Sequence, residues 1–538
     1  MPPSTMAGLS SRIDALRPKI EELMRIGGTP GLSLGIMHQG ERVYYASYGY
    51  RDVEQRLPLT DETILPVCSL TKAVTSAALG ILVDEKKSNW DTLVKDALPS
   101  FNIKDDILQN HMTLSDLLCH RSGMSWGDNL IIGTENNILI SEKDSMAYLN
   151  SQTRLLPFRG QFAYNNLAYE LAGKVIESLS QQSYFDFVQS RILDPLGMTR
   201  TYLKTPPSDL DNVGKCYNAL GNGTSAPVTC VQAGNDWFGT PHAGMRSCVS
   251  DLMKLYKAFM TGFNDQIASG KTSTDKLPLK QVSQLMSAKI FMDQPSRNEA
   301  SYGFGWGRVQ LPGRLGQIGI NPGLMPNGMP IVGKGVAPRL VIFHQGSLPG
   351  ALSLNLLLPD TESAIVISSN ALALNDVPDW VGQLVLEEFL EVPESQRNDY
   401  IEASKISSAE NLKWYPNLIK ELQQAQRNGT SPKELESYVG TYWDRLHIFK
   451  IVVTVESGAL YWALQGLESE KFRLSHYEDD VFTWLQPREE LSRRGRWVGT
   501  DQGPSFWKVE FKIGEAGKPN RLYWVHDNDV PAAEYSKE

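Results

Sequence analysis

The chain has 538 residues, more than one hydrophobic core usually organises, so we expect one large domain and a smaller one. Apolar residues make up 41% and charged residues 21%, which are ordinary values for a globular protein. The net charge of -9 offers no basic surface for a polyanion, which argues against a nucleic-acid partner.

The first residues, MPPSTMAGLSSRIDALRPKIEELM, alternate charged and apolar side chains and lack the basic-then-apolar order of a signal peptide. The longest apolar run, AVTSAALGILV, has 11 residues, about half the length that a bilayer needs. We therefore expect a soluble, cytoplasmic protein with no membrane partner.

Cysteines and histidines suggest neither a disulfide framework nor a metal site. The five cysteines are an odd count without a C-x-x-C pair, so we predict buried free thiols, as in a reducing cytosol. The eight histidines include no H-E-x-x-H motif and no Cys/His cluster, and we expect no metal and no cofactor. The cysteines are Cys68, Cys119, Cys216, Cys230 and Cys248.

Strand patterns occur at both ends of the first 390 residues. Residues 31–48 alternate apolar and small residues and predict two strands joined by a turn at Gln39-Gly40-Glu41. Residues 69–195 predict helices and loops, and strand patterns return over 338–370. The simplest packing is one antiparallel sheet flanked by helices, including 377–391, with a helical lobe: an α/β plus all-α fold.

The composition changes after this region. We assign residues 1–394 to the first domain and 395–432, which are polar, to a helical linker followed by a loop. Residues 433–538 carry short aromatic strands separated by turn residues, which predict a small antiparallel β-barrel.

Two serine patterns compete as the source of a nucleophile. Ser125 lies in Gly-Met-Ser-Trp-Gly, which matches the nucleophile elbow of α/β-hydrolases, but helical spacing precedes it and a turn-rich loop follows. S-x-x-K occurs at Ser69–Lys72 and at Ser273–Lys276. Ser273 lies in a polar stretch, whereas Ser69 opens an apolar helix, so we favour Ser69.

Residues three apart on a helix share one face, so the Lys72 amine can take the Ser69 proton. A lysine acts as a base only when it is often neutral. Lowering its pKa from about 10.4 towards 7 requires roughly 4 to 5 kcal/mol of desolvation or repulsion, which predicts a buried, crowded site.

The order Ser69-x-x-Lys72, Tyr164-Asn165-Asn166 and His344-Gln345-Gly346 resembles the three motifs of the serine β-lactamase and penicillin-binding-protein superfamily. LLCHRSGM, PHAGMRSCVSDLMKLY and YGFGWG are similar to its class C-like esterase, transesterase and D-aminopeptidase branch. The resemblance implies a β-lactamase/transpeptidase-like fold over roughly 10–390. The C-terminal barrel resembles the lipocalin-like domain of some of these hydrolases.

The resemblance also implies roles for individual residues. Ser69 is the nucleophile, Lys72 and Tyr164 transfer protons, and Asn166 contacts Lys72 and the substrate. Backbone N–H groups of Ser69 and Ser347 form an oxyanion hole. His344 and Gly346 lie at the substrate, and of the three H-x-G segments only the one at His344 is expected to be functional, in contrast to His38 and His242.

The expected activity is acyl transfer through a Ser69 acyl-enzyme, from an ester or thioester to water or to another acceptor, with secondary metabolism as one setting. The expected partner is a small acyl substrate, and the oligomeric state stays open. Because His344 replaces the lysine of K-T-G, carboxylate recognition should be weak. The alternatives are amide hydrolysis, as by a D-aminopeptidase or β-lactamase, and ligand binding without catalysis.

Overall fold

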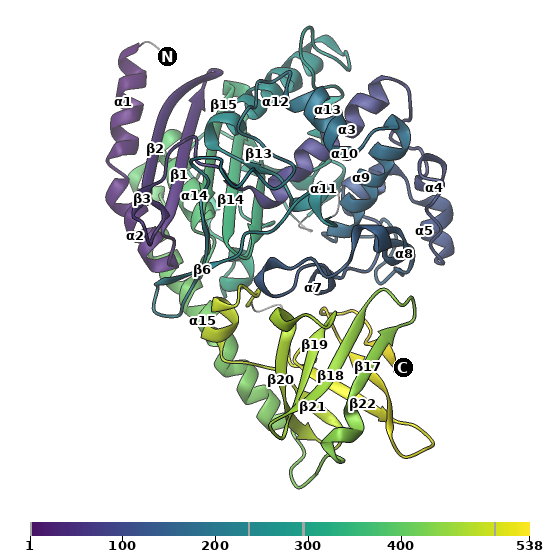
Figure 1. The fold of residues 1–538 in the computed structure, drawn as a ribbon. Helices are drawn as coiled ribbons and strands as arrows, with labels where there is room; N and C mark the ends of the chain where they lie inside the picture. Colours follow the sequence, from purple (N-terminus) through teal and green to yellow (C-terminus); the bar gives the residue numbers. More distant parts are fainter. Residues whose placement is uncertain (1–2, 235–236, 293–295, 500–501) are drawn as a thin grey trace.

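A computed structural model describes residues 3–234, 237–292, 296–499 and 502–538. A large domain is built on an antiparallel sheet, a smaller β-barrel lies below it, and the short helix α7 (Asp128–Ile131) lies at their junction (Figure 1). The predicted architecture, an antiparallel sheet flanked by helices with a helical lobe and followed by an antiparallel barrel, is confirmed.

Nine strands form the central sheet, and each pairs antiparallel with its neighbours. The N-terminal hairpin lies directly beside the late strand β15, as the two regions of alternating residues predict. In spatial order the strands are β3 (Leu57–Pro58), β2 (Glu41–Asp52), β1 (Gly31–His38), β15 (Ser363–Ser369), β14 (Ala351–Leu358), β13 (Arg339–Leu348), β10 (Gly307–Leu311), β9 (Ala300–Tyr302) and β8 (Ile290–Phe291).

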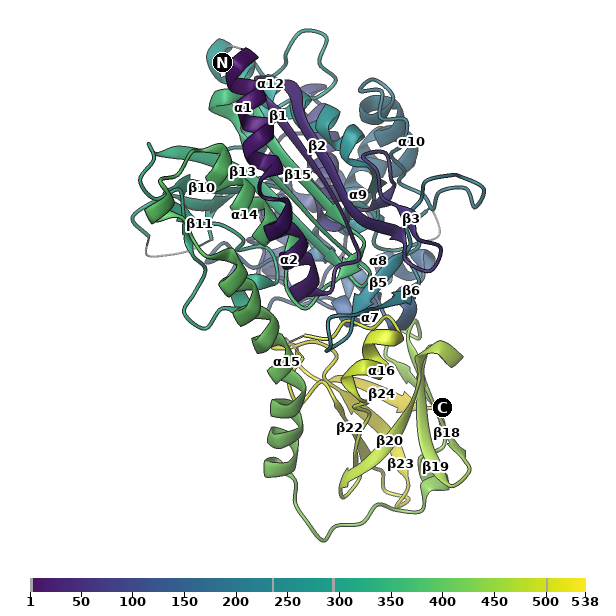
Figure 2. The ribbon, with the colours of Figure 1, turned by 90° about the vertical axis from the view of Figure 1, so that its left-hand side faces the viewer.

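Helices cover both faces of the sheet. Helices α1 (Pro3–Asp14), α2 (Arg17–Gly27) and α14 (Val377–Phe389) lie on one face (Figure 2). Ile365 and Ile367 of β15 belong to the apolar cluster on that face, and their neighbour Val366 belongs to the cluster on the other. The alternation along a strand thus supplies two cores.

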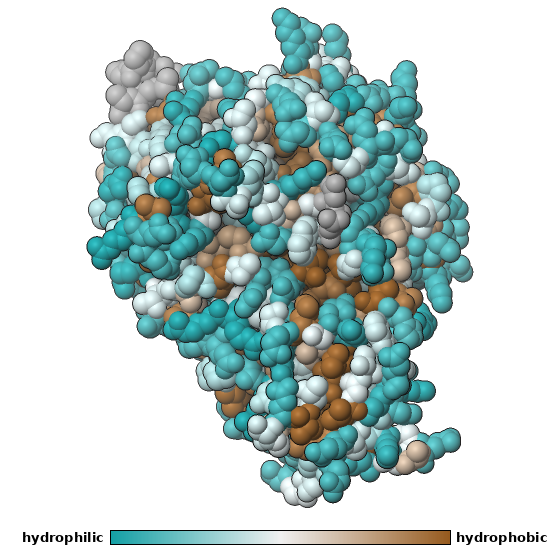
Figure 3. All heavy atoms as spheres, viewed as in Figure 1, coloured by the Kyte–Doolittle hydropathy of each residue, from teal (hydrophilic) through white to brown (hydrophobic). Residues whose placement is uncertain are grey.

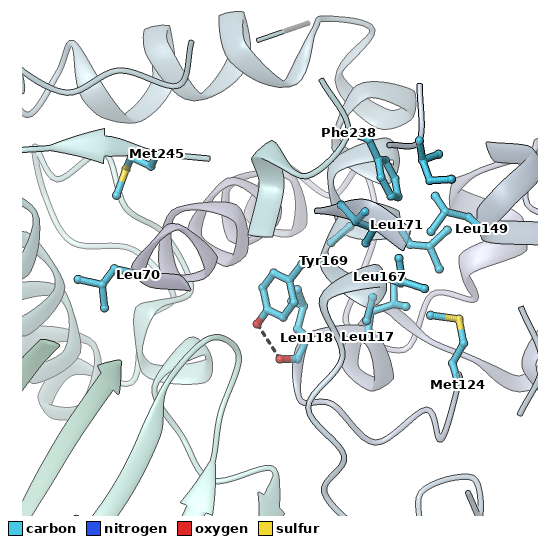
Figure 4. Packing of buried hydrophobic residues seen from close by; sticks show 14 of the residues in the cluster. Leu70, Leu117, Leu118, Met124, Leu149, Leu167, Tyr169, Leu171, Phe238 and Met245 are labelled. Atoms are coloured by element: carbon cyan, nitrogen blue, oxygen red, sulfur yellow. Dashed lines mark hydrogen bonds between the residues drawn. The ribbon is translucent and has the colours of Figure 1, made fainter. Parts of the chain in front are cut away.

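The helical lobe lies on the second face and contains the helices that follow the Ser69 and Tyr164 motifs. Tyr169 of α9 donates a hydrogen bond of 2.7 Å to the Leu118 carbonyl at the end of α6, amid packed leucines (Figure 4). This bond ties α9 to α6. The lobe's helices are α3 (Thr71–Asp84), α4 (Val94–Ala97), α5 (Asp106–His111), α6 (Leu114–Leu118), α8 (Ser145–Asn150), α9 (Asn166–Ser180), α10 (Tyr184–Val188), α11 (Thr240–Ala243), α12 (Val249–Ser269) and α13 (Val282–Leu285).

Within the described residues, eight antiparallel strands close the C-terminal barrel, which confirms the small barrel predicted for this region. Buried aromatic rings fill its interior; the Trp462 ring lies 5.2 Å from those of Trp484 and Trp524. The strands are β17 (Gly440–Asp444), β18 (Lys450–Glu456), β19 (Ala459–Leu464), β20 (Lys471–Glu478), β21 (Val481–Thr483), β22 (Lys508–Ile513), β23 (Pro519–Trp524) and β24 (Ala533–Lys537).

Helix α15 (Tyr400–Ala425) occupies most of the segment assigned to the linker and packs on both domains. Its N-terminal part contacts α2 and α14. Further along, the Trp414 indole donates to the Gln502 carbonyl at 3.0 Å, and the Leu422 carbonyl accepts from Tyr477 at 2.6 Å. The helix is therefore a packed strut between the domains.

The prediction of buried free thiols is confirmed for Cys68, Cys119 and Cys248 and is wrong for Cys216 and Cys230, which form a disulfide. An odd count excludes complete pairing but does not exclude one pair, here across the hairpin of β5 (Cys216–Ala219) and β6 (Ser225–Val228). Cytoplasmic location stays a prediction, and the cysteines no longer support it, because a disulfide is unusual in a reducing cytosol. Among the described helices, none is both long and apolar enough to cross a bilayer.

Candidate active site

Ser69 lies in a 3₁₀ turn, η1 (Cys68–Leu70), directly before α3. Cys68 has φ 51°, a left-handed conformation that costs a residue with a side chain about 1 to 3 kcal/mol. The turn is fixed from both sides, since Thr71 Oγ1 donates to the Cys68 carbonyl at 2.6 Å and accepts from the Met245 N–H at 3.1 Å. The strained turn holds Ser69 at the start of the helix.

Lys72 lies one turn further along α3 and is completely buried. Its Nζ donates to Ser69 Oγ at 3.0 Å, to Asn166 Oδ1 at 2.8 Å and to the His242 carbonyl at 3.0 Å. Burial lowers the pKa of Lys72 to about 7, against smaller opposing effects of Asp128 and other acidic groups. A lysine with this pKa is neutral in a large fraction of molecules near pH 7 and can act as a base.

The Tyr164-Asn165-Asn166 segment begins α9 and divides its roles among three residues. Asn165 caps the helix by accepting from the Ala168 N–H at 3.1 Å, and it donates to the carbonyls of Met124 and Ser125. Asn166 accepts from Lys72. Asn165 thus fixes the backbone of this segment, while Tyr164 and Asn166 face the nucleophile.

Tyr164 lies beside Ser69, and its ring centroid is 4.8 Å from Lys72 Nζ. Burial raises the pKa of Tyr164 well above its ordinary value, and the Ser69 hydroxyl opposes this only in part. The phenol is consequently protonated near pH 7 and is suited to donate a proton, while Lys72 is the group suited to accept one.

The third motif lies on β13, directly after the part of that strand that pairs with β10. The pairing with β10 stops at Phe343, so the residues after it have no neighbouring strand on that side within the described part of the chain. Ser347 lines the cavity beside Ser69, as an oxyanion-hole residue must. Gly346 has a packing role: a Cβ there would lie 2.7 Å from the Val67 carbonyl oxygen and 2.9 Å from the Cys68 Cβ. Any larger residue would push β13 away from the nucleophile turn.

His344 is buried behind Tyr164, with 6.2 Å between the two ring centroids, and it is not among the residues that line the cavity. Its Nε2 hydrogen-bonds the Tyr302 hydroxyl at 2.9 Å. Burial, aided by the nearby Lys72, lowers the pKa of His344 to about 3. The imidazole is therefore neutral over the whole physiological range.

The alternative serines and histidines have structural surroundings. Ser125 is buried and donates to Gln152 at 2.8 Å, and Ser273 forms a loop bridge with Lys280. His38 ends β1 and hydrogen-bonds Ser363 at 2.8 Å. His242 is paired with the buried Glu170 at 2.8 Å, and its carbonyl, not its ring, holds Lys72.

A cavity of about 270 Å³ opens over Ser69, and residues of both domains line it. Asp128 and Asn129 of α7 form one wall, and Trp497 and Asp527 of the barrel form another. None of these four residues was recognised from the sequence. On the surface, apolar residues gather near the junction of the two domains (Figure 3).

The docking of the barrel at this cavity rests on specific bonds. The Trp126 indole donates to the Asn528 carbonyl at 3.0 Å, and the Asn129 amide donates to Asp527 Oδ1 at 3.1 Å. Within the described residues, no group of three or more His, Cys, Asp or Glu side chains is placed to hold a metal ion.

Two family models match the chain, one for each domain. The model described as Beta-lactamase matches residues 16–384. The model described as Domain of unknown function (DUF3471) matches residues 424–536, which include the barrel.

Individual relatives match different shares of the chain. Protein flp of Staphylococcus aureus (strain COL) is 29% identical over 237 residues, 43% of this chain and 46% of that protein, so the chain matches less than half the length of this relative. Unguisins hydrolase ungD' of Aspergillus campestris is 23% identical over 435 residues, 77% of this chain and 72% of that protein.

A solved structure, the octameric penicillin-binding protein homologue from Pyrococcus abyssi, matches with a TM-score of 0.57 and 21% identity, over 97% of this chain and 99% of that one. At this identity the match describes the fold, and it extends through both domains.

Proposed function

The chain belongs to the Beta-lactamase family, and from this premise we propose that it is a serine hydrolase or acyltransferase of the esterase and transesterase branch, which works through an acyl-enzyme on Ser69. The observation that carries the proposal is the 3.0 Å contact between Lys72 Nζ and Ser69 Oγ, made by a lysine whose pKa burial lowers to about 7. A lysine with a purely structural role would not require contact with a serine hydroxyl, so this contact together with the lowered pKa favours a catalytic role.

In the proposed reaction, neutral Lys72 accepts the Ser69 proton as Oγ attacks the acyl carbonyl. The backbone N–H groups of Ser69 and Ser347 stabilise the oxyanion, which contributes about 3 to 4 kcal/mol per donor. Tyr164, held protonated by burial, gives its proton to the leaving oxygen, and the proton on Lys72 replaces it. Water or another nucleophile then releases the acyl group by the reverse sequence.

Neutral esters or thioesters are the proposed substrates. An anionic β-lactam needs a cation beside its carboxylate, and His344, which stands where K-T-G carries lysine, is neutral and bonded to Tyr302. The lining of the cavity contains no Lys, Arg or His among its described residues. One relative is named an unguisins hydrolase, which supports hydrolysis as an outcome.

The barrel is proposed to shape the substrate cavity and not to hold a ligand inside. Its interior is occupied by aromatic side chains, and Trp497 and Asp527 reach the cavity over Ser69. In this role, a lipocalin-like domain would contact the substrate with residues at the end of its barrel and not with its interior.

Intact-mass spectrometry after incubation with neutral esters, thioesters, D-amino-acid amides and penicillins tests this proposal. We expect an acyl adduct from an ester or thioester, and faster turnover of neutral esters than of penicillins at pH 8. Faster turnover of penicillins than of every neutral ester would replace the esterase assignment with a β-lactamase. The matched control is Ser69→Ala, which should form no adduct.

A further inference from the structure

The cavity over Ser69 is lined by apolar and polar side chains, and the charged residues among those described in its lining are two carboxylic acids, Asp128 and Asp527. Asp128 lines the cavity, and its Oδ1 accepts from Asn166 Nδ2 at 3.0 Å. Asp527 approaches from the barrel, where Asn129 Nδ2 and the His526 ring hold its carboxylate at 3.1 Å and 2.7 Å. The two acidic side chains therefore line the same cavity from the two sides of the domain junction.

The same cavity also contains a hydrogen-bond acceptor without a donor, the side-chain oxygen of Gln345. Gln345 is 2% exposed and lines the cavity, and its Nε2 donates to Asp376 at 3.1 Å. Its Oε1 has no hydrogen-bond partner among the described residues. A buried amide oxygen without a donor costs free energy, which a ligand N–H at this point would recover.

Neither of the two basic groups near Asp128, Lys72 and His242, is a permanent counter-ion for its carboxylate. Burial raises the pKa of Asp128, and the nearby Asp527 raises it further, while the hydrogen bond from Asn166 opposes the rise and His242 and Lys72 add smaller opposing effects. Lys72 loses its charge in the form that acts as a base, and His242 is already paired with Glu170. On the barrel side Arg496 offsets part of the charge of Asp527. The raised pKa shows that the charged form of Asp128 is disfavoured beside Asp527, and a cation bound between the two carboxyl groups would stabilise that form.

We infer that the substrate carries an ammonium group, which binds Asp128 in the Ser69 cavity with the negative charge of Asp527 beside it. This inference rests on the proposed function, because it places the cation on an ester or thioester that acylates Ser69. A primary ammonium also has enough donors to reach the free oxygen of Gln345. The barrel then takes part in substrate selection, since it supplies one of the two carboxylates.

The alternative role for Asp128 is to position Asn166, which holds Lys72. The two roles differ in what Asp128→Asn changes. An asparagine oxygen still accepts from Asn166, so a positioning role predicts equal effects on all substrates. A binding role predicts a loss confined to cationic substrates.

The test compares isosteric ester pairs that differ only in charge. One pair places the cation on the leaving group: 2-(dimethylamino)ethyl acetate, which is protonated at pH 7 and keeps one N–H donor, and 3-methylbutyl acetate, its carbon isostere. The other places it on the acyl group: the p-nitrophenyl esters of aminohexanoate and heptanoate. We expect wild type to show a kcat/KM about tenfold or more higher for the cationic member of at least one pair, as one charge-assisted bond provides.

Asp128→Asn should reduce that preference about tenfold, and Asp527→Asn should reduce it by a smaller factor, since its oxygens are already bonded. The matched control is Glu510→Gln, the same charge change on the barrel surface, where Glu510 pairs with Lys512, and it should keep the preference. Equal kcat/KM for both members of both pairs in wild type overturns the inference without any variant, as does an Asp128→Asn protein that loses activity equally on both.

The same assay separates this inference from the proposed function. Hydrolysis of the neutral esters without a cationic preference overturns the inference alone. If no ester reacts and a fluorophosphonate does not label Ser69, the proposed function is wrong and the inference with it.

Discussion

Lys72 in the sheet domain and Arg496 in the barrel are both cations with almost no exposed surface, 0% and 1% respectively, yet their surroundings differ. Three acceptors surround Lys72, and one of them is the Ser69 hydroxyl. Arg496 packs over aromatic rings, 4.8 Å from the Trp484 centroid, and lies 3.6 Å from the buried Glu470.

Burial lowers both pKa values, to about 7 for Lys72 and to about 10 for Arg496. The first value permits proton exchange at neutral pH, whereas the second keeps the guanidinium charged. Burial of a cation is therefore no sign of catalysis by itself. A low residual pKa together with contact to a nucleophile is what separates the catalytic candidate from the structural ion.

The largest expected effect is on activity. Lys72→Met removes the group that accepts the Ser69 proton, so the acylation rate should fall by about 10² to 10⁴, as is typical for loss of a general base. Ester turnover and intact mass measure the loss, and circular dichroism checks the fold. Arg496→Leu is the comparison variant, because it deletes a buried cation whose ion pair is with Glu470 and not with Ser69. A Lys72→Met protein that is folded and near wild type in acylation contradicts the role of Lys72.

The second effect is on stability in the barrel. Glu470→Gln leaves the Arg496 guanidinium buried without its counter-charge, which typically costs about 3 to 5 kcal/mol. Chemical denaturation should show this loss, and replacing both residues, Glu470→Gln with Arg496→Leu, should recover part of it. The exposed neighbour offers a control, since Glu468→Gln should change stability by about 0.5 kcal/mol or less. Equal small effects of both single changes would show that the buried pair is not coupled.

The third effect is a pH dependence of stability caused by Lys72. Its pKa is lower in the folded than in the unfolded chain, so the unfolded chain binds more protons between about pH 7 and 10.4, and stability rises with pH in that window. Below about pH 7, Lys72 is charged in the folded chain as well, so the full free-energy cost of burying the cation is present. The stability advantage of Lys72→Met over wild type should therefore shrink by about 2 to 3 kcal/mol between about pH 6 and pH 9.

Denaturation curves at both pH values measure that difference. The control is Lys104→Met at an exposed position, whose difference from wild type should stay constant with pH. A Lys72→Met difference that does not change with pH means that Lys72 is not buried as a cation.

Local features of the site could be predicted from the sequence because they depend on nearby residues. Ser69 and Lys72 are one helical turn apart, and the apolar helix after them already indicates burial. The sheet followed in the same way from alternation along β1, β13, β14 and β15. The order of the three motifs then indicated which elements meet.

Features that depend on docking could not be predicted. Asn129 and Asp527 meet although 398 residues separate them, and no local pattern marks either as part of a cavity. His344 was expected at the substrate, but side chains alternate along β13, so His344 is buried against Tyr302 while its neighbour Gln345 lines the cavity. The Cys216–Cys230 disulfide depends on a hairpin whose strands are too short to give a clear pattern.

The most direct test of the account is covalent labelling of the nucleophile. A fluorophosphonate should label wild type at Ser69, label Ser125→Ala and Ser273→Ala at comparable rates, and leave Ser69→Ala unlabelled. Peptide mapping of the adduct identifies the serine, and circular dichroism shows that the Ser69→Ala protein is folded. Labelling that persists in folded Ser69→Ala would contradict the assignment of Ser69 and, with it, the role given to Lys72.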